Sequence, residues 1–286
     1  MFRRIVVAYD GSDRAQDALA LALRLRDPVN GRITLACALT GKHHARDDVP
    51  EEVGIMLASA RAQIAPGIRV ALRAPVAGSP ARALTELAES EHADLVVVGS
   101  SRRISDGRIR LERTAGRLLQ GAPCAVAVAP PGLRTDAPFH HVGIAYDGSA
   151  EARVALTAGY SIAAACDAAV TVAYALLTIP DTREELAWRQ RLRAQGLLDE
   201  AAEGAPEGVN PRTLLLHGPA GPTIAKAFAY IVDVLVCGSR SYGPIERALM
   251  GSVAEELMEG APHPVVVLPR KVAAIATAPQ PAVLEA

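Results

Sequence analysis

The sequence predicts an α/β protein built from two tandem, doubly wound, five-stranded parallel sheets. Three observations support this fold class: the chain repeats itself, short β-branched runs alternate with helical stretches, and half of the 286 residues are hydrophobic while only 3% are aromatic. A core of Ala, Val, Leu and Ile is typical of parallel strands covered by helices on both faces. This length accommodates two domains of ordinary size.

The repeat is visible in the sequence itself. RIVVAYDGSDRAQDAL at 4–19 returns as HVGIAYDGSAEARVAL at 141–156, an offset of 137 residues, and ADLVVVGS at 93–100 returns as VDVLVCGS at 232–239, an offset of 139. The offsets differ by only two residues, so the two halves are copies produced by duplication. We therefore expect them to be related by pseudo-two-fold symmetry.

Within each copy, the hydrophobic pattern switches between the periods of strands and helices. Segments with helical spacing include Ala15, Leu19, Ala22 and Leu23. Alternation of strand and helix predicts right-handed crossovers and a parallel sheet. The strands of the first copy are expected at about 3–9, 32–39, 68–74, 94–99 and 124–129.

The domain boundaries follow from the repeat and from composition. We expect one domain at 1–132 and a second at 139–270, joined by the Pro- and Gly-rich segment PPGLRTDAPFH at 130–140. After Arg270, small residues and prolines follow without periodicity, which predicts a flexible tail at 271–286.

Charge and cysteine usage narrow the function classes. A formal net charge of −1 gives no overall attraction to nucleic acid or to an anionic membrane. No stretch reads as a signal peptide or a membrane span, so we expect a soluble, cytoplasmic protein. The cysteines share no CxxC spacing and are expected to be buried free thiols of a reducing compartment, with no metal site: Cys37, Cys124, Cys166 and Cys237.

A candidate ligand site lies where the strand order of an open α/β sheet reverses, beyond the carboxyl ends of the strands. In the second copy the first strand ends in Asp147, the fourth ends in Gly238, and Gly251-Ser252 follow at an expected helix start. Glycines let backbone N–H groups approach a phosphate, serine adds a hydroxyl donor, and a helix N-terminus adds partial positive charge. These features predict a phosphate cradle.

The cradle is not a P-loop, because no Gly-Lys-Ser/Thr follows the glycines. The whole chain has three lysines, Lys42, Lys226 and Lys271, and none lies in this loop. Phosphoryl transfer that depends on a lysine is therefore disfavoured.

The motifs AYDGS, GSRSYG, LMGSV and APHPVVV together make the chain resemble a tandem universal stress protein, over 1–132 and 139–270. ATP-binding members of that family carry G-x2-G-x9-G-[ST] after the fourth strand. Here Gly238 opens the motif, Ser241 takes the place of its second glycine, and Gly251-Ser252 close it. The resemblance also implies a Rossmann-like fold and antiparallel pairing of the two fifth strands, 124–129 and 264–268.

The same resemblance implies an adenine nucleotide, ATP, in the second copy. Ala145 and Asp147 would lie near the adenosine, and Ala175 would offer backbone groups to the base. Mg²⁺ could bridge the phosphates, although only Asp147 is an obvious protein ligand and no metal-ligand set is assigned. The ribose and phosphates would be lined by Gly238, Arg240, Ser241, Gly251, Ser252 and Val253.

The first copy departs from the motif. At the offset of 139, Arg102 replaces Ser241, Glu112 replaces Gly251 and Arg113 replaces Ser252. A carboxylate repels phosphates, and large side chains would fill the cradle. Our hypothesis is that the first site is degraded and closed to ATP while the second is nearly intact.

Alternative interpretations accompany these. Asp10 is expected only to satisfy backbone groups at a helix entry, and Trp188 is expected to be a packing residue. The leading functional hypothesis is a nucleotide-binding stress-response regulator with no catalytic residue, an unknown protein partner and a possible homodimer. A slow ATP hydrolase or adenylyl transferase, and a nucleotide-free interaction scaffold, are the alternatives.

Overall fold

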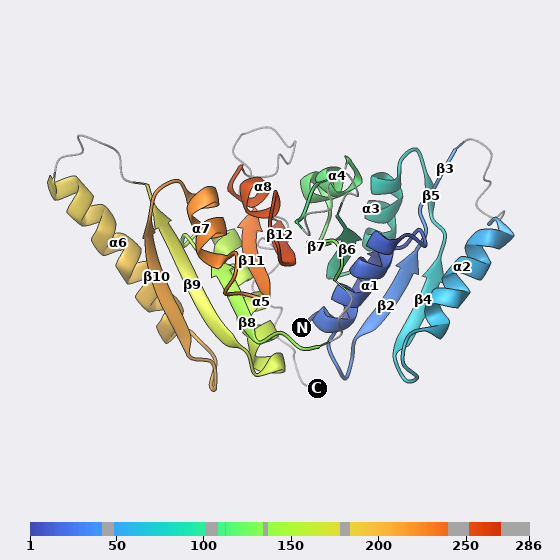
Figure 1. Ribbon diagram of the computed structural model, residues 1–286, viewed down its shortest axis with the longest axis horizontal. Coiled ribbons are helices and arrows are strands. Elements are labelled where there is room, and N and C mark those ends of the chain that lie inside the picture. Colours follow the sequence, from blue (N-terminus) through green and yellow to red (C-terminus); the bar gives the residue numbers. More distant parts are fainter. Residues whose placement is uncertain are drawn as a thin grey trace, which may run out of the picture.

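The computed structural model describes residues 1–41, 49–100, 108–111, 113–133, 137–177, 184–239 and 252–269. Ten strands in this part of the chain form one continuous sheet, with helices on both faces (Figure 1). The strand order is β10-β9-β8-β11-β12-β7-β6-β1-β2-β4. Each half of this order is a doubly wound parallel sheet, which confirms the predicted fold class.

The first copy contributes the strands expected from the sequence. A short pair, β3 with β5, forms a separate two-stranded sheet that the sequence did not predict, because two-residue strands show no periodicity. The elements are β1 Arg4–Ala8, α1 Asp13–Leu25, β2 Arg32–Ala36, β3 Leu39–Thr40, α2 Glu51–Ala62, β4 Arg69–Arg73, β5 Val76–Ala77, α3 Pro80–Ser90, β6 Leu95–Gly99, α4 Arg113–Gly121 and β7 Ala125–Ala129.

The second copy repeats the arrangement, with β8 and β11 at the reversal of strand order. Its elements are β8 His141–Ala145, α5 Ala150–Cys166, β9 Ala169–Leu176, α6 Glu184–Glu203, β10 Pro211–His217, α7 Ala220–Phe228, β11 Val234–Ser239, α8 Ser252–Met258 and β12 Val265–Pro269. Helices α1, α2, α5 and α6 contribute to the core on one face of the sheet, and α3, α4, α7 and α8 to the core on the other.

The two copies join through their fifth strands. β7 and β12 pair antiparallel, with Val266 opposite Ala127 and Val267 opposite Val126. This confirms the predicted pairing. Because each strand covers the open edge of the other, neither copy leaves its fifth strand exposed to solvent.

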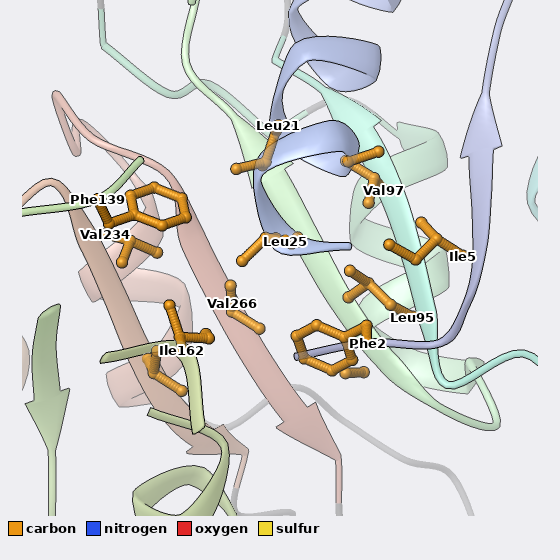
Figure 2. Packing of buried hydrophobic residues seen from close by; sticks show 14 of the residues in the cluster. Phe2, Ile5, Leu21, Leu25, Leu95, Val97, Phe139, Ile162, Val234 and Val266 are labelled. Carbon is orange, nitrogen blue, oxygen red and sulfur yellow. The ribbon is translucent and has the colours of Figure 1, made fainter. Parts of the chain in front are cut away.

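The joint is also packed. One continuous hydrophobic cluster includes Phe2 and Leu25 from the first copy and Ile162 and Val266 from the second, and Figure 2 shows these side chains facing one another. The linker takes part through Phe139, which is fully buried and lies with its ring centroid 3.8 Å below the Arg24 guanidinium. The two copies therefore share a core.

A second contact crosses between the copies. Ile109, in the connection from β6 to α4, donates its N–H to the Ala261 carbonyl at 2.8 Å and accepts from the Gly260 N–H at 2.9 Å. Its side chain is fully buried. Beside it, Arg110 Nη1 lies 3.0 Å from Glu259 Oε1. Residues 109–110 of the first copy are thus held by hydrogen bonds and an ion pair to residues 259–261, which follow α8 in the second copy.

Some side chains depart from expectation. Cys124 and Cys237 are buried as predicted, but Cys37 and Cys166 are only half-buried; all four are free thiols. Trp188 is 59% exposed on α6, so its expected packing role was wrong.

None of the described helices has the length and apolarity needed to cross a bilayer. The predicted tail at 271–286 lies outside the described residues.

Candidate functional site

The turn from β8 into α5 is fixed by three consecutive residues. Gly148 has φ of 76°, and a Cβ there would lie 2.6 Å from Leu197 Cδ2. Ser149 caps α5 by accepting from the Ala152 N–H at 3.2 Å, and its own N–H donates to Asp147 Oδ1 at 2.9 Å. The sequence Asp-Gly-Ser therefore holds the Asp147 carboxylate at the carboxyl end of β8.

A crevice of about 120 Å³ opens beside this turn, between the carboxyl ends of β8 and β11. It contains five of the residues predicted for the nucleotide site, which lie far apart in the sequence: Ala145, Asp147, Ala175, Gly238 and Val253. The other lining residues are Tyr146, Ser149, Ala152, Ala220, Ile224, Cys237, Ala254 and Leu257.

The remaining predicted residues are described only in part. Ser252 is the first residue of α8, whose next two residues line the crevice. Arg240, Ser241 and Gly251 lie outside the described residues. The structure thus brings together the three residues predicted near the adenosine and two of those predicted for the ribose and phosphates, and the rest of the phosphate loop stays a prediction from sequence.

Glycine is required at the end of β11. A Cβ on Gly238 would lie 2.7 Å from the backbone carbon of Glu151, at the start of α5. The first copy repeats this constraint, because a Cβ on Gly99 would lie 2.2 Å from the Arg14 carbonyl oxygen. In both copies the close approach of strand and helix forms the floor of the crevice.

Two wall residues in the second copy are electrically neutral at physiological pH. Burial raises the pKa of the Cys237 thiol to about 12, so this sulfur is not a thiolate nucleophile. Burial also raises the pKa of Tyr146 above its usual value. Sequence reasoning missed Cys237, and it missed Ala220 and Ile224 of α7, although α7 follows the third strand at the same edge of the sheet.

The first copy has an equivalent crevice of about 180 Å³. Its distinguishing feature is an ion pair: Arg14 Nη2 lies 3.0 Å from Asp10 Oδ2, and the Ser12 hydroxyl donates to the same carboxylate. Burial opposes ionisation of Asp10, but these hydrogen bonds outweigh it and hold its pKa below the usual value. Asp10 accepts the Ser12 N–H at 3.1 Å, as expected at a helix entry, and it also lines this crevice.

The hypothesis that the first site is closed stays a prediction. Arg113 begins α4 with an exposed side chain and does not line the crevice, whereas the hypothesis places it at the phosphates. Arg102 and Glu112 lie outside the described residues. The described walls leave a crevice in the first copy that is no smaller than that in the second.

Comparison with known proteins assigns both halves to one family. The model of the universal stress protein family matches residues 1–130 and again residues 138–269. A relative named "Universal stress protein in QAH/OAS sulfhydrylase 3'region", from Thermus aquaticus, is 33% identical over 138 residues, which are 46% of this chain and 98% of that protein.

Several solved structures resemble nearly the whole chain, among them the following two. A candidate universal stress protein from Pseudomonas aeruginosa UCBPP-PA14 is 20% identical, with 96% of each chain covered and a TM-score of 0.69. A universal stress protein from Archaeoglobus fulgidus DSM 4304 is 17% identical, with 93% of this chain and 96% of that chain covered and a TM-score of 0.62. At these identities the likeness concerns the fold.

Proposed function

The chain belongs to the universal stress protein family, and we propose that it is a stress-response regulator that binds one ATP molecule per chain, in the second copy. The observation that carries this proposal is the convergence of Asp147, Ala175, Gly238 and Val253 on one crevice. The family resemblance implies that all four contact the nucleotide. Their positions at the reversal of strand order are where open α/β sheets bind ligands.

The shape of the crevice suits the base end of a nucleotide. Its walls are mostly small and apolar, with Asp147 and Ser149 as polar groups at the mouth. Its volume of about 120 Å³ is well below the ~300–1,000 Å³ of pockets that enclose a drug-sized ligand. The crevice would therefore hold the base, and the phosphates would lie outside it, toward the start of α8.

The phosphate end of the proposal rests on sequence. Gly238 and Gly251-Ser252 keep the spacing of the ATP-binding motif, and Ser252 begins a helix. Backbone N–H groups and a hydroxyl would hold the phosphates without a lysine. Arg240 is the one cation among the predicted contacts, and Mg²⁺ would offset the remaining phosphate charge. No catalytic group is assigned, which supports a binding role rather than a dedicated enzyme.

The proposal is tested by calorimetric titration with ATP, with and without Mg²⁺, after native mass spectrometry has shown whether a nucleotide copurifies. We expect a stoichiometry near one. Asp147→Ala should weaken binding at least tenfold, because it removes a charged hydrogen-bond acceptor worth about 1.5–3 kcal/mol. Asp10→Ala is the matched control, since it removes the equivalent carboxylate from the first copy.

Four results would count against the proposal. A stoichiometry near two would mean that both crevices bind. An equal loss in Asp10→Ala and Asp147→Ala would remove the assignment to the second copy. The absence of binding by ATP, ADP and AMP would favour the nucleotide-free scaffold, and steady phosphate release well above a buffer control would favour the hydrolase.

A further inference from the structure

Arginines form a row across three neighbouring strands of the first copy. Arg4 of β1 is in register with Arg32 of β2, which is in register with Arg69 of β4. Residues in register on parallel strands point to the same face of the sheet, and strands lie about 4.8 Å apart, so the row spans roughly 10 Å. Arg73 is four residues beyond Arg69 on β4 and therefore lies on that face too.

These arginines line a shallow depression of about 700 Å³, together with Arg3 and residues 90–92 at the end of α3. Their side chains are exposed. The row lies at the amino ends of β1, β2 and β4, at the lower edge of the first copy in Figure 1, whereas both crevices lie at the carboxyl ends of the strands. The depression is therefore a separate site.

Positive charge in the depression exceeds its local compensation. Five arginines and two carboxylates line it: Glu91 is paired with one of these arginines, its Oε1 lying 3.0 Å from Arg73 Nε, and it also accepts from the Thr34 hydroxyl at 2.6 Å. Asp94 accepts the backbone N–H groups of Arg3 and Arg4 at 2.8 and 2.9 Å. Like charges side by side on a sheet destabilise it, so a bound anion would relieve this repulsion.

Asp94 belongs to the duplicated frame and not to the arginine row. In the second copy Asp233 accepts the backbone N–H groups of His140 and His141 in the same way, at 2.6 and 2.9 Å. Both copies therefore use a carboxylate at this position to bind backbone N–H groups, whether or not arginines surround it.

The second copy shows that the fold does not need the arginines. His141 is in register with Ala169 where the first copy pairs Arg4 with Arg32. Leu214, in register with Ala173, takes the place of Arg73. The halves differ in charge as well: 1–132 holds 18 Lys and Arg against 14 Asp and Glu, while 139–270 holds 10 against 15. The near-zero net charge conceals this asymmetry.

We propose that this depression binds an oligophosphate, a ligand with three or more phosphates in close succession. Arginine forks bind phosphate and carboxylate equally well in geometry, so spacing decides between them. Carboxylates on one face of an extended peptide lie about 6.6–6.8 Å apart, which is wider than the roughly 4.8 Å between neighbouring arginines in the row. The lining contains no Phe, Tyr or Trp, and so offers no stacking platform for the bases of a single-stranded nucleic acid.

The test is calorimetric titration of the full chain with inorganic tripolyphosphate at about 0.15 M salt. Arg32→Ala with Arg69→Ala should weaken binding at least tenfold, as expected when charge-assisted hydrogen bonds are lost. Arg32→Lys with Arg69→Lys keeps the charge but loses the forks, and should give an intermediate loss. Thermal unfolding checks that the variants fold, as expected for exposed side chains.

The matched control is Arg189→Ala with Arg212→Ala, which removes two exposed arginines from the second copy and should change affinity less than about threefold. Asp147→Ala should also leave tripolyphosphate binding intact. An equal loss in the Arg189/Arg212 control, loss in Asp147→Ala, or no binding by the unmodified protein would each overturn the proposal. Tighter binding of a hexaglutamate peptide than of tripolyphosphate would replace the oligophosphate with an acidic protein segment.

Discussion

The two crevices share a glycine at the end of the fourth strand and differ in the charged residues at their entrance. Gly99 and Gly238 sit where any side chain would collide with helix backbone, and both copies keep them. At the mouth, Arg14 pairs with Asp10 in the first copy, while the equivalent position in the second is Glu151. Duplication has therefore preserved what the backbone requires and allowed the ligand-facing side chains to diverge.

The cores of the two copies have diverged by paired substitutions, in which one residue gains side-chain volume and a neighbouring residue loses it. Gly143 of β8 occupies the place of Val6, and a Cβ there would lie 2.9 Å from Val232 Cγ1 and 3.2 Å from Phe228 Cδ2. Ile144 and Gly159 in the second copy replace Val7 and Ala22 in the first, with the same number of side-chain carbons. Each copy reaches a filled core by its own combination.

The largest expected effect comes from removing the side chain that fills the space above Gly143. Phe228 is fully buried, and Phe228→Ala should lower the free energy of unfolding by about 3–5 kcal/mol, because the cavity cannot collapse onto a glycine. Urea denaturation measures this. A loss under about 1 kcal/mol would show that neighbouring side chains rearrange to fill the space that Phe228 leaves.

A smaller effect is expected from Gly159→Ala. The new Cβ would lie 2.5 Å from Ile144 Cδ1, and overpacking of this kind costs about 1–3 kcal/mol. Adding Ile144→Val recreates the first copy's pair and should recover most of the loss. A double-mutant cycle in urea gives the coupling energy. Additive effects of the two substitutions would show that the pairs are not exchangeable.

The third effect depends on pH and compares His263 with its first-copy counterpart, Cys124. Burial lowers the pKa of His263 below the 6.5 of an exposed histidine, despite hydrogen bonding to the backbone at Pro264. The unfolded chain therefore binds this proton more tightly, and stability falls as the pH drops through 6.5 toward the folded pKa.

His263→Cys should flatten the change in melting temperature between pH 7.5 and 5.5. Each pKa unit separating the two states corresponds to about 1.4 kcal/mol. His141, whose pKa burial also lowers, stays in the variant and should leave a residual slope in the same direction. An unchanged pH dependence in His263→Cys would show that the slope has another origin.

The smallest effect concerns the ion pair at the mouth of the first crevice. Arg14→Glu introduces the second copy's residue, and because both partners are partly exposed, the cost in stability should be under about 1 kcal/mol. The pKa of Asp10 should rise, since it loses a hydrogen bond and gains a negative neighbour. Carbon-detected NMR titration of the Asp10 carboxyl follows this, and an unchanged pKa would contradict the role given to Arg14.

Much of the fold could be predicted because buried parallel strands appear as continuous apolar runs, and because the repeat shows the pattern of each strand and helix twice. Val126 and Val267 lie in such runs, and the pairing of their strands follows from edges that need to be covered. The contacts of Ile109 with Gly260 and Ala261 could not be predicted, since a loop that pairs across copies has no periodicity. The exposure of Trp188 could not be predicted either, because it depends on which face of α6 packs against β9 and β10.

The candidate site was predictable to a similar degree. Asp147, Ala175 and Gly238 lie at or just beyond the carboxyl ends of their strands, and strand ends converge by topology alone. Ala220 and Ile224 enter the wall through the packing angle of α7, which sequence does not determine. The arginine row could not be predicted, because Arg4, Arg32 and Arg69 become neighbours only through strand register.

The central claim is that the second copy binds ATP and the first does not, and a double substitution tests it most directly. Gly251→Glu with Ser252→Arg gives the second copy the residues of the first. ATP affinity, measured by calorimetry, should fall at least ten- to a hundredfold, because a charge-assisted hydrogen bond worth about 1.5–3 kcal/mol is lost and a carboxylate faces the phosphates. The melting temperature should be nearly unchanged. An affinity within about threefold of the unmodified protein would contradict the account and place the nucleotide elsewhere.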